Sequence, residues 1–144
     1  NEFKRLYQIH CNDKTGPYPG IIELLRELKK HNIKMGIATN KVKSAADKLN
    51  EIYFEGLIDE VAGVEDGIIP KPDRCMIDNL MKRLNATTDE TLYVGDSQVD
   101  VATARNTGLD MVAVLWGFRT RKELEESGAM VFIDDPMEIL DKVL

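Results

Sequence analysis

From about residue 20 to its end, the chain alternates short apolar runs with segments whose apolar residues recur every three or four positions. The short runs are typical of buried strands, and the periodic segments have the single apolar face of amphipathic helices. We expect strands over 33–38, 57–63, 92–94, 111–115 and 131–133, and helices over 20–31, 42–53, 73–84, 98–107, 120–127 and from 136. This order predicts right-handed βαβ crossovers and a parallel sheet with helices on both faces.

The first nineteen residues do not follow this alternation. Phe3, Leu6, Tyr7 and His10 share one helical face, so we expect a helix over 1–10. The stretch CNDKTGPYPG that follows contains two Pro and two Gly, which is the composition of a turn or a domain boundary.

Composition limits the class of protein. At 144 residues the chain has the size of one domain, and 43% apolar with 31% charged residues indicates a globular protein. No apolar run approaches the roughly 20 residues of a membrane span, and a net charge of -6 argues against nucleic acid as a partner. Cys11 and Cys75 fit neither a metal site nor a disulfide framework, so we expect buried thiols and a cytoplasmic protein.

Unusual polar residues follow the predicted strands. Thr39 and Asn40 come after the strand 33–38, and Gly95-Asp96-Ser97 come after the strand 92–94. Lys71 lies in a loop between two prolines. In open parallel sheets, ligands bind outside the carboxyl ends of the strands, so we expect these residues to gather at one edge.

Each of these residues has two interpretations at this stage. Asp96 is either an N-cap or a ligand for a hard cation such as Mg²⁺. Asp100, one helical turn further, either binds a metal-bound water or holds Lys71. Thr39 either caps the next helix or binds a phosphate at the helix start. Lys71 is either a solvated surface lysine or a positive charge for a phosphoryl oxygen.

The order of these residues resembles a known family. TN at 39–40, KP at 71–72 and GDSxxD at 95–100 are similar to the second, third and fourth motifs of the haloacid dehalogenase superfamily. Within it, the chain resembles the phosphoglycolate phosphatase group, through PYPGI at 17–21, GIATNK at 36–41, KPD at 71–73, YVGDSQVDVATARNTG at 93–108 and WGFR at 116–119. The resemblance implies a three-layer Rossmann-like core over 17–144 and the end of a helical cap with its hinge over 1–16.

The resemblance also implies a reaction: Mg²⁺-dependent hydrolysis of a small, phosphoglycolate-like phosphate monoester through an aspartyl-phosphate. Thr39, Asn40 and Lys71 would bind the substrate phosphate, with Thr39 and Lys71 counted as catalytic. Asp96 would bind the metal, and Ser97 and Asp100 would support it without touching the ion. The expected partner is a small phosphorylated metabolite.

The superfamily's first motif, DxDGT, supplies the nucleophilic aspartate and does not occur in the sequence. The nearest string is Asp134-Asp135, which lacks the spacing, the Gly and the Thr and better matches a surface turn. We therefore expect a C-terminal fragment, inactive alone, whose sheet lacks its central strand. Two open inner edges would then promote self-association.

Two alternatives remain to be weighed. The first is a non-catalytic phosphate-binding or regulatory domain that keeps the phosphate-site loops without a nucleophile. The second, a response-regulator-like receiver, should carry its acids near the N-terminus, and the order Thr39, Lys71, GDSxxD does not fit it.

Overall fold

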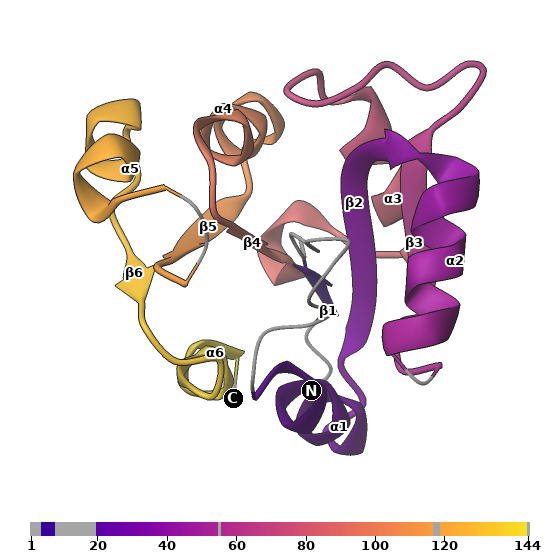
Figure 1. Ribbon diagram of the computed structural model, residues 1–144, viewed down its shortest axis with the longest axis horizontal. Coiled ribbons are helices and arrows are strands. Elements are labelled where there is room, and N and C mark those ends of the chain that lie inside the picture. Colours follow the sequence, from indigo (N-terminus) through magenta and orange to yellow (C-terminus); the bar gives the residue numbers. More distant parts are fainter. Residues whose placement is uncertain (1–3, 8–19, 55, 117–118, 144) are drawn as a thin grey trace.

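The computed structural model describes residues 4–7, 20–54, 56–116 and 119–143, and these form a parallel α/β structure. Its sheet has six strands in the order β3-β2-β1-β4-β5-β6, and every neighbouring pair is parallel (Figure 1). The strands are β1 (Lys4–Tyr7), β2 (Lys34–Val42), β3 (Glu60–Val64), β4 (Leu92–Gly95), β5 (Asp110–Val114) and β6 (Phe132–Ile133). The helices are α1 (Ile21–Lys30), α2 (Lys43–Tyr53), α3 (Cys75–Leu84), α4 (Gln98–Thr107), α5 (Arg121–Ser127) and α6 (Glu138–Val143), with a 3₁₀ turn at Thr88–Glu90.

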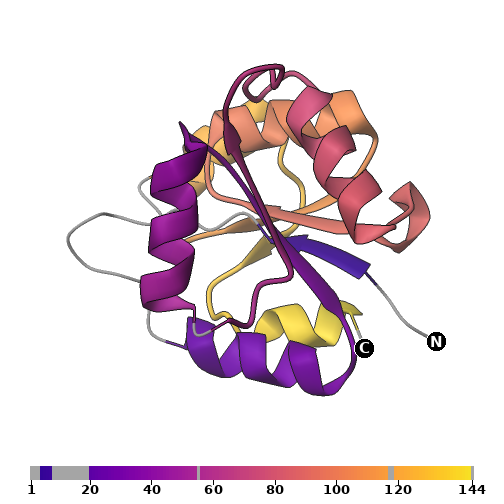
Figure 2. The ribbon, with the colours of Figure 1, turned by 90° about the vertical axis from the view of Figure 1, so that its right-hand side faces the viewer.

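Helices cover both faces of the sheet, which makes three layers. Apolar side chains of α1, α2 and α6 pack in one core with Leu92 and Val94 of β4. Those of α3 and α4 pack in a second core with Tyr93, which points to the opposite face as strand alternation requires. Helices α1 and α6 are in contact and lie side by side on their face, as Figure 2 shows. The predicted α/β fold class is confirmed.

Most predicted elements lie within a few residues of the observed ones, and local signals explain their ends. Gly108 ends α4 in the left-handed conformation with φ 73°. Thr120 and Glu123 form a reciprocal capping box at the start of α5. Strand β2 runs further than predicted, because its pairing with β3 resumes at Val42 after a register shift beyond Ala38. Thr39 and Asn40 therefore lie within the irregular end of β2.

The predicted helix over 1–10 is wrong for residues 4–7, which form strand β1. This strand pairs with β2 on one side and with β4 on the other. Without β1, the inward-facing N–H and C=O groups of β2 and β4 would lack hydrogen-bond partners. The need to pair these groups outweighs the helical spacing of the local sequence. The inner sheet edges that were expected to be open are therefore paired. Residues 8–19 lie outside the described part, so the division into 1–16 and 17–144 stays a prediction.

Two composition-based expectations meet the structure here. Within the described residues, no helix combines the length and the apolar character needed to cross a bilayer. Cys75 is a free, partly buried thiol, whereas Cys11 lies outside the described residues.

Candidate active site

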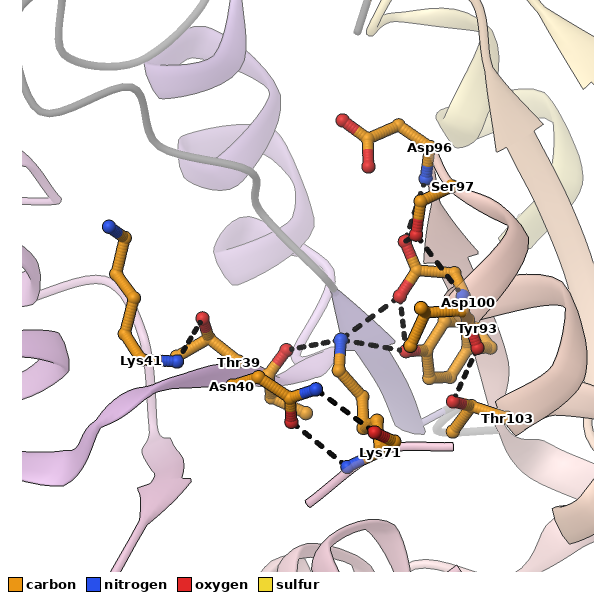
Figure 3. Close-up of polar contacts among 11 residues, drawn as sticks. Thr39, Asn40, Lys41, Lys71, Tyr93, Asp96, Ser97, Asp100 and Thr103 are labelled. Atoms are coloured by element: carbon orange, nitrogen blue, oxygen red, sulfur yellow. Dashed lines mark hydrogen bonds and ion pairs between the residues drawn. The ribbon is translucent and has the colours of Figure 1, made fainter. Parts of the chain in front are cut away.

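The candidate site lies at the carboxyl ends of β2 and β4, on either side of β1. Strand β2 carries Thr39 and Asn40, and Asp96 directly follows β4. Lys71 enters from the connection between β3 and α3, and Asp100 lies in the first turn of α4. Figure 3 shows Asp100 at the Lys71 ammonium and Asn40 at the Lys71 backbone, with Thr39 and Asp96 lying to either side of them. The expectation that they gather at one edge of the sheet is therefore confirmed.

Lys71 is buried, with 7% of its surface exposed, and is not a solvated surface lysine. Its Nζ donates to the Ala38 carbonyl at 3.1 Å, to the Tyr93 hydroxyl at 3.2 Å and to Asp100 Oδ1 at 3.0 Å. Burial lowers the pKa of Lys71, and the charges of Asp100 and Asp96 oppose that shift. The ammonium thus links β2, β4 and α4 across the end of β1.

Asp100 is the acceptor at the centre of this network. Its Oδ1 accepts from Lys71 and from the Tyr93 hydroxyl at 2.8 Å, and its Oδ2 accepts from the Asp96 N–H and the Ser97 hydroxyl, each at 3.0 Å. Burial alone would raise the pKa of Asp100, but the Lys71 charge and these hydrogen bonds hold it below its usual value. Of the two roles considered for Asp100, the structure shows that it holds Lys71.

Tyr93 is a site residue that the sequence analysis missed. Its side chain is 1% exposed, and its hydroxyl donates to Asp100 and accepts from Lys71. Burial and the Asp100 charge raise the pKa of Tyr93 well above its usual value, so the phenol keeps its proton. The sequence contained a signal for this role, because Tyr93 lies in the apolar run LYV. The hydroxyl of a tyrosine buried in such a strand usually makes a hydrogen bond.

Ser97, not Asp96, caps helix α4. The Ser97 hydroxyl accepts from the Asp100 N–H at 3.2 Å, while the Asp96 carboxylate points away from Asp100 (Figure 3). Asp96 is itself buried, with 4% of its surface exposed, and its charge lies close enough to Lys71 to influence the pKa of that lysine. Gly95 is required by close packing, since a Cβ there would lie 2.6 Å from Asp100 Cγ.

Thr39 and Asn40 do not cap α2, whose N-cap is Val42 without a side-chain hydrogen bond. Thr39 Oγ1 accepts from the Lys41 N–H at 3.2 Å, and the side chain is only partly buried. Asn40 uses its side chain on the Lys71 backbone, with Nδ2 to Lys71 O at 3.0 Å and Lys71 N–H to Oδ1 at 2.9 Å. The prediction that Thr39 and Asn40 bind phosphate stays a prediction, and the Asn40 amide group has a structural partner.

A family model described as haloacid dehalogenase-like hydrolase matches residues 1–114 of the chain. The chain belongs to this family. A phosphoglycolate phosphatase of Rhodospirillum rubrum is 36% identical over 121 residues, which are 82% of this chain and 49% of that protein. A phosphoglycolate phosphatase of Pseudomonas syringae is 30% identical over 96% of this chain and 51% of its own length. The chain thus spans about half the length of these curated relatives.

Solved structures give the same result for the fold of this haloacid dehalogenase-like chain. A crystal structure from Lactobacillus delbrueckii subsp. bulgaricus, provisionally assigned as a phosphoglycolate phosphatase, superposes with a TM-score of 0.88 at 38% identity. The match covers 94% of this chain and 56% of that protein. A phosphatase assigned from sequence in Clostridium acetobutylicum gives a TM-score of 0.80 at 27% identity, over 88% of this chain and 59% of its own.

Phosphatases of the haloacid dehalogenase-like family generally use Mg²⁺. This ion takes oxygen ligands in octahedral geometry, commonly one or two carboxylates with waters and a phosphate oxygen. Asp96 offers one buried carboxylate of the right chemistry, whereas Asp100 already accepts four hydrogen bonds. Within the described ranges, no group of three or more metal-ligating side chains occurs. By its chemistry and burial, Asp96 therefore fits as one ligand of such an ion.

Asp134 and Asp135, the nearest match to the first motif, form a surface turn. Their backbone N–H groups donate to Glu138 Oε2 at 2.7 and 2.9 Å, and both residues are exposed. They follow β6, at the outer edge of the sheet and three strand positions from β1. The interpretation of this pair as a surface turn is confirmed.

Proposed function

We propose that this chain supplies the phosphate-binding and lysine-bearing part of a phosphoric monoester hydrolase that acts on a small phosphorylated metabolite. The observation that supports it most is the buried Lys71–Asp100 pair beside Asp96, at the sheet edge where ligands bind. The named activity of the Rhodospirillum rubrum and Pseudomonas syringae relatives supports a phosphoglycolate-like substrate.

In this proposal each residue has one task. The Thr39 hydroxyl and the Asn40 backbone orient the phosphate oxygens at the end of β2. The Lys71 ammonium neutralises the negative charge that the phosphoryl group carries during transfer. Asp96 contributes one carboxylate ligand to Mg²⁺, which stabilises that charge when bound. Asp100 and Ser97 keep Lys71 and Asp96 in place and do not meet the substrate.

The sequence contains no DxDGT string. In the superfamily that this chain resembles, an aspartate of DxDGT takes the phosphoryl group and water then hydrolyses the aspartyl-phosphate. We propose that the 144 residues alone do not turn over substrate, and that activity needs an aspartate from a preceding segment.

The test is phosphate release from p-nitrophenyl phosphate and phosphoglycolate, measured with and without Mg²⁺. One sample is the 144-residue chain, and the other is a chimera that places ahead of it the part of the Rhodospirillum rubrum relative preceding the matched half. We expect release by the chimera only. Phosphate binding by both samples without release by either would favour a non-catalytic phosphate-binding domain.

A further inference from the structure

Lys71 reaches a site that is distant from the strand that precedes it. It follows β3, the edge strand, yet its Nζ contacts Tyr93 of β4 and Asp100 of α4. Neighbouring strands are about 4.8 Å apart, so three positions along the sheet amount to roughly 14 Å. A lysine side chain is too short for that span, and the backbone at Lys71 must itself be held over the carboxyl ends of the strands.

Two asparagine side chains, from β2 and from α4, hold this backbone. Asn40, at the end of β2, makes two hydrogen bonds to Lys71, one to its N–H at 2.9 Å and one to its C=O at 3.0 Å. Asn106, in the last turn of α4, donates its Nδ2 to the Pro72 carbonyl at 2.8 Å. Three consecutive backbone polar groups of the Lys71-Pro72 segment are thus fixed by side chains that come from two different elements.

The chemistry of the amide explains why asparagine serves here. An amide carries one acceptor and two donors, so Asn40 can pair with the N–H and the C=O of the same residue. An aspartate would place a second acceptor against the Lys71 carbonyl. Pro72 has no N–H, so its carbonyl is the only backbone group through which Asn106 can hold it.

We infer that Asn40 and Asn106 are positioning residues. Their hydrogen bonds hold the Lys71-Pro72 backbone where the Lys71 ammonium can reach the buried Asp100 carboxylate. This inference rests on the proposed role of Lys71 in binding phosphate. Helix α4 then contacts this segment twice: Asp100 in its first turn accepts from the Lys71 ammonium, and Asn106 in its last turn donates to the Pro72 carbonyl. The side-chain amide of Asn40 thus acts on the Lys71 backbone and not on the substrate.

The first test is amide hydrogen exchange of the Lys71 N–H, followed by NMR on the 144-residue chain. Asn40→Ala removes its acceptor, and we expect exchange to accelerate about tenfold. Asn106→Ala replaces an exposed residue and leaves the core intact, and we expect it to accelerate exchange of the Lys71 N–H about threefold. The control is Arg105→Ala, which removes a hydrogen bond of the same kind to the Ser127 carbonyl, outside this segment. Unchanged exchange of the Lys71 N–H in both asparagine variants would overturn the positioning role of the two asparagines.

The second test asks whether the asparagines act through Lys71. Binding of orthophosphate is measured by NMR titration for Asn106→Ala, Lys71→Met and the double variant. We expect Asn106→Ala to weaken phosphate binding about threefold when Lys71 is present. In the Lys71→Met background, the same substitution should have no effect. An equal loss in both backgrounds would contradict a positioning role. If Lys71→Met itself leaves phosphate binding unchanged, the proposed function of Lys71 is wrong. The exchange rates of the Lys71 N–H then decide by themselves whether the two asparagines hold the Lys71-Pro72 backbone.

Discussion

The Nζ atom of Lys71 lies 3.0 Å from Asp100 Oδ1, and the two side chains are only 4% and 3% exposed. A pair of opposite charges removed from water pays a large desolvation cost, which close contact and additional hydrogen bonds must offset. The additional hydrogen bonds come from Tyr93, Ser97, the Asp96 N–H and the Ala38 carbonyl. A charged pair retained at such cost, at the carboxyl ends of parallel strands, is the arrangement expected of a functional site.

The Lys71–Asp100 pair gives a stability prediction that can be measured by urea unfolding. Lys71→Met leaves a buried carboxylate without its cation, and we expect it to lower the free energy of unfolding by about 3–5 kcal/mol. Asp100→Asn should lower it comparably, because it leaves the cation without its anion. The double variant removes both charges and should cost clearly less than the sum. Additive losses would show that the two side chains are not coupled.

Tyr93→Phe tests the hydroxyl without disturbing the packing of the ring. It removes a donor to Asp100 and an acceptor for Lys71, so we expect a loss of about 1–2 kcal/mol in the free energy of unfolding. The matched control is Tyr53→Phe in α2, whose hydroxyl makes no hydrogen bond within the described part of the chain, and its loss should stay near zero. Equal losses of unfolding free energy in the two variants would show that the Tyr93 hydroxyl does not stabilise the Lys71–Asp100 pair.

Gly95→Ala tests the close approach of β4 to α4. An added Cβ would overlap Asp100 Cβ and lie 2.7 Å from Asp100 Oδ2. Asp100 must then move, and with it the contact to Lys71. We expect the free energy of unfolding to fall by about 1–3 kcal/mol and orthophosphate binding to weaken. Wild-type stability and binding would mean that the site tolerates this displacement.

Glu138 gives a pH prediction away from the site. Hydrogen bonds from the Asp135 and Asp134 N–H groups lower the pKa of Glu138 below its usual value. Because the folded pKa is depressed, the stabilisation is present above the unfolded pKa and is lost as the pH falls through the folded value. The side-chain carboxyl resonance of Glu138, followed by NMR from pH 7 downward, should titrate with a midpoint below the usual glutamate value. A midpoint at or above the usual value would contradict these bonds.

Sequence alone could predict the layered α/β fold, because its evidence is local. Apolar periodicity, Gly108 as a C-cap and Thr120 as an N-cap locate the ends of elements. The grouping of Lys71 with Asp96 also followed from the rule that polar residues after parallel strands meet at one edge. These inferences need no knowledge of which side chains touch.

What sequence could not provide depends on distant contacts. Residues 4–7 have helical spacing in the printed sequence, but their place between β2 and β4 is decided by the backbone groups of those strands. The partners of Asn40 are likewise set by the path of a loop that begins twenty-five residues later, at Glu65. The apolar run at 92–94 predicts only a strand that contains Tyr93, and its contacts with Lys71 and Asp100 reveal the use of its hydroxyl.

The most direct measurement is Mg²⁺-dependent phosphate release by the chimera with and without Asp96→Asn. The carboxamide keeps the shape of the side chain but loses the charge that a hard cation requires. The proposed site predicts that Asp96→Asn abolishes Mg²⁺-dependent turnover of p-nitrophenyl phosphate while the folded state persists. Near-normal turnover by the variant would contradict the role of Asp96, and turnover by the 144-residue chain alone would show that it contains a nucleophile of its own.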